Sequence, residues 1–107
     1  MSNWEICEII PTTMSMPMYG PMPFTACYLW FTATKDGRHD QPPIRQKEAG
    51  GTTAGEIERV ANGSSGFEKN PTRVAALEEL TRELRADGWE YFETGECWFS
   101  RRFRRRI

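Results

Sequence analysis

The sequence predicts an α+β fold, with an antiparallel sheet of four or five strands and one amphipathic helix on one face. Three observations predict it. Apolar positions in residues 71–87 recur at helical spacing, residues 24–35 are rich in aromatic and β-favouring side chains, and two further strand candidates follow Gly88. The expected element order is β-β-β-α-β-β, and 107 residues are enough for a single domain, residues 1–107.

The first two strand candidates are residues 4–10 (WEICEII) and residues 24–35 (FTACYLWFTATK). We expect the first to end at Pro11, because proline has no amide hydrogen to donate. The second is apolar on both faces and therefore central in the sheet. Between them, residues 11–23 are rich in proline and methionine, which predicts an extended connector, either a flap over the sheet or an ordinary surface loop. One stripe of the second strand suits a helix above it: Cys27, Leu29, Phe31 and Ala33.

The middle of the chain contains fewer apolar residues. Residues 36–55 begin with an Asp36-Gly37 turn and are polar with glycine and proline, so we predict a long mobile loop. Residues 56–62 (EIERVAN) are predicted to form a short third strand, although the same residues also fit one helical turn. Residues 63–66 (GSSG) have the composition of a flexible turn.

The helix and the two strands after it have clear local signals. Asn70 is a good N-cap and Pro71 occupies the first helical position, where its missing N–H costs nothing. Gly88 ends the helix. Strands are then expected at residues 89–93 and 97–103, around a turn at residues 94–96. The apolar side of the helix is expected to carry Val74, Ala76, Leu77, Leu80 and Leu84.

The charges are unevenly distributed along the chain. The formal net charge is −1, yet five arginines lie in residues 101–107, which form a basic C-terminal tail: Arg101, Arg102, Arg104, Arg105 and Arg106. An acidic body with a basic tail favours an acidic partner or contact of the tail with the chain's own acidic face. The tail could equally be a solvated terminus or a partner's docking strand. The internal partners that we considered for it are Glu56, Glu58, Glu78 and Glu79.

The cysteines predict an intracellular protein. Cys7, Cys27 and Cys97 are an odd number, lie far apart and fall in apolar runs, so we expect buried free thiols in a reducing compartment, the cytoplasm. The N-terminal residues lack the basic and long apolar regions of a secretion signal, and no run approaches 18 apolar residues. Neither secretion nor a membrane span is therefore expected.

Several residues of the last third share a pattern with other proteins: Leu77, Leu80, Leu84, the Asp87-Gly88-Trp89-Glu90 junction, Gly95, Trp98 and Phe103-Arg104. This pattern resembles a loose group of small bacterial proteins of unassigned function. They have an antiparallel sheet, one helix, the Asp-Gly-Trp-Glu junction and a closing Trp/Phe/Arg strand. The resemblance extends more weakly to Trp4-Glu5 and residues 24–34, and excludes the loop at 36–55 and the arginine-rich end. It implies the fold and no catalytic residue.

An aromatic face of the sheet is the main functional prediction. Opposite the helix we expect Tyr28, Trp30, Trp98, Arg102 and Arg104. We predict a non-enzymatic module that self-associates or binds another protein by burying these aromatic side chains, with arginines at the rim. The proline- and methionine-rich connector could instead cover them. The alternative function is binding of single-stranded nucleic acid, in which bases stack on the rings and phosphates pair with these arginines and with Arg101, Arg105 and Arg106.

No enzyme, metal or cofactor is expected. His39 is the only histidine and lies beside Asp40 in a polar loop, which does not predict the fixed geometry of acid–base catalysis. The cysteines lack the close pairing of zinc sites. Residues 50–55 are glycine-rich but lack the Gly-Lys-Ser/Thr ending of a phosphate-binding loop, and no convincing helix is expected after them. Three carboxylates near the last turn do not suggest a paired-carboxylate site: Glu90, Glu93 and Glu96.

Overall fold

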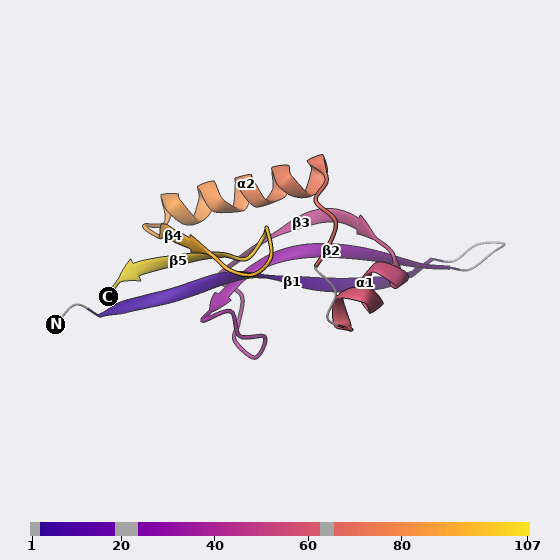
Figure 1. Cartoon of the computed structure of the whole chain (residues 1–107), viewed down its shortest axis with the longest axis horizontal. Coiled ribbons are helices and arrows are strands. Elements are labelled where there is room, and N and C mark those ends of the chain that lie inside the picture. The colour runs from indigo at the N-terminus through magenta and orange to yellow at the C-terminus, as the bar shows by residue number, and fades with distance from the viewer. Residues whose placement is uncertain (1–2, 19–23, 63–65) are drawn as a thin grey trace.

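The computed structural model describes residues 3–18, 24–62 and 66–107. Within them the fold is α+β, as predicted, with the element order β-β-β-α-α-β-β (Figure 1). The strands are β1 (Trp4–Met18), β2 (Phe24–Lys35), β3 (Arg45–Thr52), β4 (Glu90–Thr94) and β5 (Arg101–Arg106). The helices are α1 (Ala54–Ala61) and α2 (Pro71–Ala86).

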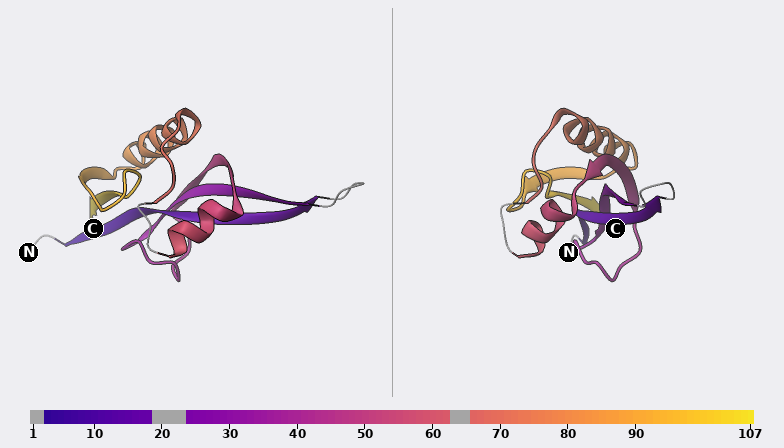
Figure 2. Two further views of the ribbon diagram at one scale, coloured as in Figure 1. Left: turned by 45° about the vertical axis from the view of Figure 1, so that its right-hand side comes forward. Right: turned by 90° about the vertical axis from the view of Figure 1, so that its right-hand side faces the viewer.

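All pairings in the sheet are antiparallel, and the strand order is β3-β2-β1-β5-β4. A long hairpin of β1 and β2 forms its centre, so β2 is central as expected. The closing strand β5 pairs with β4 and with only the first part of β1, from Trp4↔Arg106 to Glu8↔Arg102. The hairpin consequently extends beyond the other elements (Figures 1 and 2), and the whole molecule measures 61 × 28 × 26 Å along its principal axes.

The prediction that the first strand ends at Pro11 was wrong, because β1 continues to Met18. The Asp36 amide donates to the Ile6 carbonyl at 2.9 Å, so the backbone groups of Ile6 point toward β2. Backbone direction alternates along an antiparallel strand, and the odd-numbered Pro11 therefore turns its nitrogen to the outer edge. No ladder bond is lost there. Residues 11–18 are thus strand rather than connector, and residues 19–23 lie outside the described part of the chain.

Two predictions for the middle of the chain were also wrong. The expected mobile loop at 36–55 contains β3, so that only residues 36–44 connect β2 to β3. The expected strand at 56–62 is the helix α1, which was the alternative interpretation of the same residues. Thr53 caps this helix by accepting a hydrogen bond from the Glu56 amide at 3.1 Å. The fold therefore has two helices in the described ranges instead of one. Residues 63–65 of the predicted turn lie outside those ranges.

Helix α2 lies across one face of the sheet, as its sequence predicts (Figure 1). Asn70 accepts a hydrogen bond from the Arg73 amide at 2.9 Å, and Pro71 occupies the first turn. Gly88 follows the helix with φ +93°, the left-handed geometry that glycine adopts without strain. Neither helix of the described residues is long and apolar enough to cross a membrane.

The core lies between α2 and the covered face of the sheet. The leucines of α2 are buried, and so is most of the stripe predicted to lie beneath them, while Cys27 is half-buried. Residues 97–100 form a turn rather than the start of the last strand, with the Ser100 amide donating to the Cys97 carbonyl at 3.0 Å. The largest fully buried side chains include Ile9, Leu29, Phe31, Leu77, Leu80, Leu84 and Phe103.

Candidate interaction surface

The face of the sheet opposite α2 is called here the open face. Paired residues of an antiparallel ladder share a face, and Cys7 and Ile9 of β1 are in the core, so the even-numbered residues of β1 lie on the open face. The register then gives the neighbours of β1 on this face: Arg106 (beside Trp4), Arg104 (Ile6), Arg102 (Glu8), Trp30 (Thr12) and Tyr28 (Met14). Tyr28, Trp30, Arg102 and Arg104 thus occupy the predicted face.

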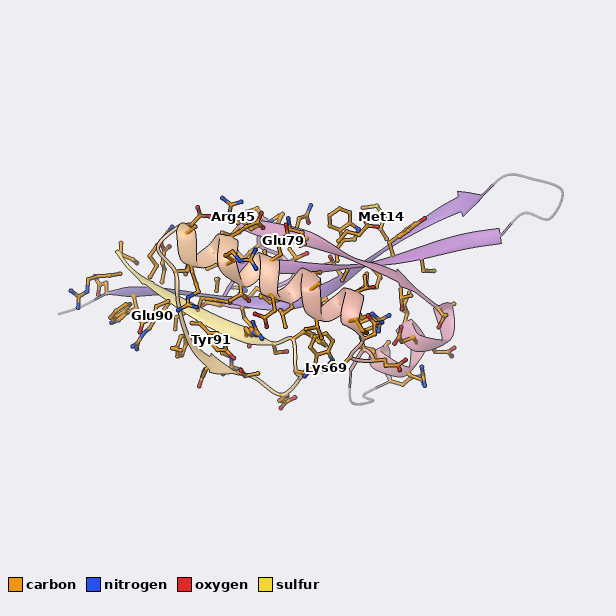
Figure 3. All side chains as sticks on the ribbon, turned by 90° about the horizontal axis from the view of Figure 1, so that it is seen from above. Met14, Arg45, Lys69, Glu79, Glu90 and Tyr91 are labelled. Atoms are coloured by element: carbon orange, nitrogen blue, oxygen red, sulfur yellow. The ribbon has the colours of Figure 1, made fainter. Side chains whose placement is uncertain are left out.

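Exposed apolar side chains lie toward both ends of this face. Trp4 is 39 % exposed, Ile6 37 % and Met14 53 %. Tyr28 and Trp30 are half-buried beside Met14. Met14 lies on the hairpin side of the molecule and Glu90 near the other end (Figure 3). We name two areas. The N-terminal patch is Trp4, Ile6 and the half-buried Phe92 of β4, which lines the same hollow as Ile6, and the hairpin patch is Met14, Tyr28 and Trp30.

The loop of residues 36–44 lies on the open-face side of the sheet, between the two patches (Figure 1). Its ends are fixed by hydrogen bonds, because the Asp36 amide donates to Ile6 and the Ile44 amide donates to the Ala33 carbonyl at 2.8 Å. Gly37, with φ +68°, packs so closely on Glu8 that a Cβ there would lie 2.5 Å from the carboxylate. Residues 36–44 are therefore tied to the sheet at both ends and pack on Glu8.

The prediction for Trp98 was wrong, because its side chain packs on the core side. The indole nitrogen donates to the Phe67 carbonyl at 2.8 Å, and the ring meets Phe31 edge-on with centroids 5.7 Å apart. Phe31 lies under α2, so Trp98 belongs to the helix side of the sheet. The reason is local: residues 97–100 form a turn, and the alternation of side chains along a strand does not extend through it.

The arginine-rich end is a paired strand rather than a free tail. Arg102 binds Glu8 at 2.5 Å and Glu93 at 2.7 Å, which raises the pKa of its guanidinium above the usual range. The remaining ion pairs of β5 are Arg101–Glu78 (2.6 Å), Arg104–Glu90 (3.3 Å) and Arg105–Glu5 (2.6 Å). Of the four partners considered from the sequence, Glu78 is used. Glu56 pairs with Arg73 and Glu79 with Lys47 instead, and Glu58 forms no ion pair in the described part of the chain.

The same arginines also stack on aromatic rings. The guanidinium carbon of Arg104 lies 4.7 Å from the centre of the Trp4 ring, and that of Arg106 lies 5.3 Å from it. Arg105 covers Trp89 on the other face at 4.4 Å. Arg106 forms no ion pair with any described residue. It is therefore the β5 arginine whose charge is least compensated within the chain.

A shallow hollow of ≈ 260 Å³ adjoins the N-terminal patch. Its apolar part is formed by Ile6 and Phe92, and its polar part by Asp36 and the Glu8–Arg102–Glu93 ion-pair group. The hollow combines an apolar floor with a charged rim of both signs, which suits an inserted side chain better than a small anionic ligand.

The other candidates from the sequence are Cys7, His39 and the glycine-rich segment before α1. Burial raises the pKa of the Cys7 thiol to about 12, so it is not an activated nucleophile. His39 is exposed in the loop. In the glycine-rich segment a helix does follow, contrary to expectation, but the carboxylate of Glu56 in its first turn opposes an anion there. The described residues contain no group of three or more histidine, cysteine or acidic side chains that could hold a metal ion.

Comparison of the chain with known protein families, with curated proteins and with solved structures finds no match. The resemblance to small bacterial proteins therefore stays a prediction. Two residues of that pattern are buried in the structure: Trp89 lies beneath Arg105, and Phe103 is fully buried on β5, the strand between β1 and β4.

Proposed function

We propose that this chain is a small interaction module that self-associates or binds another protein through the open face of its sheet. The observation that supports this proposal is the placement of Trp4, Ile6 and Met14. All three lie on one face of one strand and remain more than one-third exposed, while α2 covers only the opposite face. They lie in two patches on either side of the 36–44 loop (Figure 1), and exposed apolar patches of this kind mark candidate protein interfaces.

Residues beside the patches supply the usual anatomy of such an interface. Tryptophan, tyrosine and arginine contribute most of the binding energy at many interfaces, and this face offers Trp4, Tyr28 and Trp30. The ion pairs of Arg102 and Arg104 lie beside the N-terminal patch. Charges of both signs at a rim orient a partner more than they add affinity.

Single-stranded nucleic acid is the second candidate, and the arginines stacked on Trp4 favour it. Four of the five β5 arginines, however, already hold carboxylates: Arg101, Arg102, Arg104 and Arg105. A phosphate would have to displace these carboxylates, so the electrostatic gain on binding is reduced. We therefore place a protein partner first and nucleic acid second.

The test compares two isoleucine substitutions in purified protein. Ile6→Glu puts a charge in the N-terminal patch, and Ile107→Glu puts the same charge at a position that is already 79 % exposed beside β5. Mass is measured by light scattering on a sizing column in low and moderate salt, with absorbance at 260 and 280 nm. We expect a discrete, salt-resistant assembly that Ile6→Glu dissociates and Ile107→Glu leaves intact.

Two results would contradict the proposal. The first is a wild-type monomer at high concentration whose recovery of a protein partner is the same with Ile6→Glu. The second is a monomer that carries nucleic acid at low salt and releases it at moderate salt, which would favour the second candidate.

A further inference from the structure

Strand β4 forms a free edge of the sheet. It is the last strand in the order, and among the described strands only β5 pairs with it. Figure 3 shows Glu90 and Tyr91 of β4 on one side of α2, and Arg45 and Glu79 on the side toward β3. The strand therefore contacts α2 and still has one unpaired edge, which is where an extended peptide can add to a sheet.

The hydrogen bonds of the last turn identify the outward backbone groups of β4. The Gly95 amide donates to the Ser100 carbonyl at 2.6 Å, so the even-numbered residues of β5 direct their backbone groups toward β4. Tyr91 and Thr94 pair with odd-numbered residues of β5, and their own N–H and C=O groups consequently point away from the sheet. Both residues are exposed. An added strand would find donors and acceptors at these two positions.

The other edges of the sheet carry known protections against strand addition. The outer edge of β1 presents Pro11, and the edge strand β3 carries Lys47. Strand β4 contains neither proline nor lysine, and its two glutamates are paired with arginines of β5. It has five residues and a register shift between Tyr91 and Glu93, so it suits a short extended segment rather than a long strand.

A basic hollow of ≈ 300 Å³ lies on the helix side of β4. Arg101 connects it to β4, since its guanidinium donates to Glu78 at 2.6 Å and lies 5.4 Å from the centre of the Tyr91 ring. Glu78 is therefore neutralised, whereas Arg82 and Arg85 form no ion pair with any described residue. A positive charge remains uncompensated there. The residues that line the hollow are Glu78, Thr81, Arg82 and Arg85.

The opposite side of β4 is acidic. Phe92 and Glu93 of this strand line the ≈ 260 Å³ hollow of the open face. Three carboxylates around that hollow, of Glu8, Asp36 and Glu93, face the single guanidinium of Arg102, so its lining has a net charge of −2. Strand β4 thus separates a positive side of the molecule from a negative one.

We propose that β4 binds an extended segment of a partner protein as a sixth strand, with acidic side chains on one face of the segment and basic or aliphatic side chains on the other. Side chains alternate between the two faces along a strand. The acidic ones would point to Arg82 and Arg85, and the others to Glu93 and Phe92. Backbone hydrogen bonds give such a segment affinity, and the alternating side chains give it specificity.

A partner of this composition fits the edge better than a second copy of β4. Both glutamates of β4, Glu90 and Glu93, lie on the open-face side, where they pair with Arg104 and Arg102. Two β4 strands side by side would bring like charges together on that face, which is destabilising. The inference is separate from the proposed function, whose exposed apolar residues lie on β1, and the two can fail independently.

The experiment measures binding of two fluorescein-labelled peptides of identical composition to the full chain. In EKEVEKE every glutamate lies on one face of an extended chain, whereas in EEKVKEE the glutamates lie on both faces. Fluorescence anisotropy at low salt should show EKEVEKE binding about tenfold more tightly, a difference of about 1.4 kcal/mol. Equal binding of the two peptides, or binding of neither, overturns the inference, because the alternation is then not recognised.

Variants of the protein separate the backbone contact from the charge contact. Thr94→Pro removes an outward N–H, and the matched Thr94→Val keeps it, while both lose the hydroxyl. Arg82→Glu reverses a charge beside β4, and Arg59→Glu makes the same change at an exposed position of α1. Thr94→Pro and Arg82→Glu should each weaken EKEVEKE binding about tenfold, and the two controls should change it less than about twofold.

Circular dichroism shows that each variant is folded. If Thr94→Pro does not fold, EKEVEKE N-methylated at residues 2, 4 and 6 is compared with the same peptide N-methylated at residues 3 and 5, because only one set would face β4. Equal effects of Thr94→Pro and Thr94→Val, or of the two N-methylated peptides, overturn strand addition.

A different occupant would be identified by the mass of the unliganded protein. A wild-type dimer that Thr94→Pro dissociates and Thr94→Val preserves would make the edge a contact between two copies, which overturns the partner proposed for it. Loss of the inference in any of these ways leaves the proposed function standing, since that proposal is read from assembly or partner recovery with Ile6→Glu.

Discussion

Glu56 and Arg73 form an almost fully buried ion pair that joins three parts of the fold. The two terminal nitrogens of the Arg73 guanidinium, Nη2 and Nη1, donate to the Glu56 carboxylate at 2.7 and 2.9 Å. The carboxylate also accepts from the Thr52 hydroxyl at 2.5 Å and from the Glu68 amide at 3.1 Å. The pair therefore connects the end of β3, the first turn of α1 and the first turn of α2. The sequence placed Glu56 in a strand, and its role was not predicted.

Replacing Glu56 should destabilise the protein strongly. In Glu56→Gln the guanidinium of Arg73 stays buried without a counter-charge, and breaking a buried pair in this way costs about 3–5 kcal/mol. The control is Glu58→Gln, two residues along the same helix but exposed, which should change the free energy of unfolding by less than about 0.5 kcal/mol. Urea unfolding followed by tryptophan fluorescence measures both. Equal stabilities would mean that the pair is neutral for folding.

Acid should destabilise the protein through the same carboxylate. The hydrogen bonds from Arg73 are the largest cause that lowers the pKa of Glu56 from 4.5 to about 2. A carboxyl whose pKa is lower in the folded state contributes stability above its unfolded pKa and loses it as the pH falls toward the folded value. About 3 kcal/mol should therefore disappear between pH 5 and pH 2. Urea titrations across this range should show a clearly shallower loss in Glu56→Gln, and parallel curves would exclude this origin.

Cys7 should resist alkylation in the folded protein. Its thiol is fully buried between β5 and β2, and burial raises its pKa to about 12, so almost no thiolate is present at pH 8. Iodoacetamide treatment followed by peptide mass analysis should find Cys7 unmodified until urea unfolds the chain. Cys27 and Cys97 are half-buried, in contrast to the expectation of three buried thiols, and serve as internal references. Modification of Cys7 at the same rate in both states would contradict its burial.

At the scale of elements, local signals predicted α2 well and the strands of the first half less well. The cap at Asn70, Pro71 and the spaced leucines act within one helix, so the sequence alone contains them. Strand β3 was missed because it is a polar strand at the edge of the sheet. Its charged side chains pair with carboxylates of α2 and of Asp87, the residue that directly follows α2. Lys47 reaches Glu79 and Glu83, and Arg45 pairs with Asp87. Those partners lie far along the chain, beyond the whole of α1, where no local pattern can show them.

The sequence predicted only part of the candidate site, again because distant partners leave no local pattern. Alternation along β2 placed Tyr28 and Trp30 correctly, because a regular strand continues through both. It failed for Trp98, which lies in a turn. Trp4 and Ile6 were missed although the signal was present, since they alternate with Cys7 and Ile9 in the first strand. The carboxylates that pair with β5 include Glu5 and Glu8 near the other end of the sequence, and finding them required the β1–β5 register.

The outer edge of β1 should depend on proline for protection. Pro11→Thr restores an amide donor that points to the edge while keeping a residue that favours strands. We therefore expect faster growth of high-mass species on incubation, because the edge can then accept another strand. Time-resolved light scattering measures it, with Pro43→Thr in the exposed 36–44 loop as the control. Identical growth in the two variants would show that the edge is protected by something other than Pro11.

The whole molecule is longer than its size requires. Its radius of gyration is 15.2 Å. A compact domain of this length is expected to have a radius of gyration of about 13 Å. The projecting hairpin accounts for the difference (Figure 2). Small-angle X-ray scattering of the Ile6→Glu variant, expected to be monomeric, should give a radius of gyration no smaller than 15.2 Å. A value as small as that of a compact domain would mean that the β1–β2 hairpin folds back on the open face in solution.

The two outermost described residues of the chain are hydrogen-bonded, since the Ile107 amide donates to the Asn3 carbonyl at 3.0 Å. A short linker could therefore join these positions, and the chain could be reopened between His39 and Asp40 in an exposed loop. In such a circular permutant β5 and β1 become consecutive strands of a hairpin, so closing the sheet no longer requires a loop of about 100 residues. The slowest contact of the native topology would become local, and the permutant should fold faster into the same sheet.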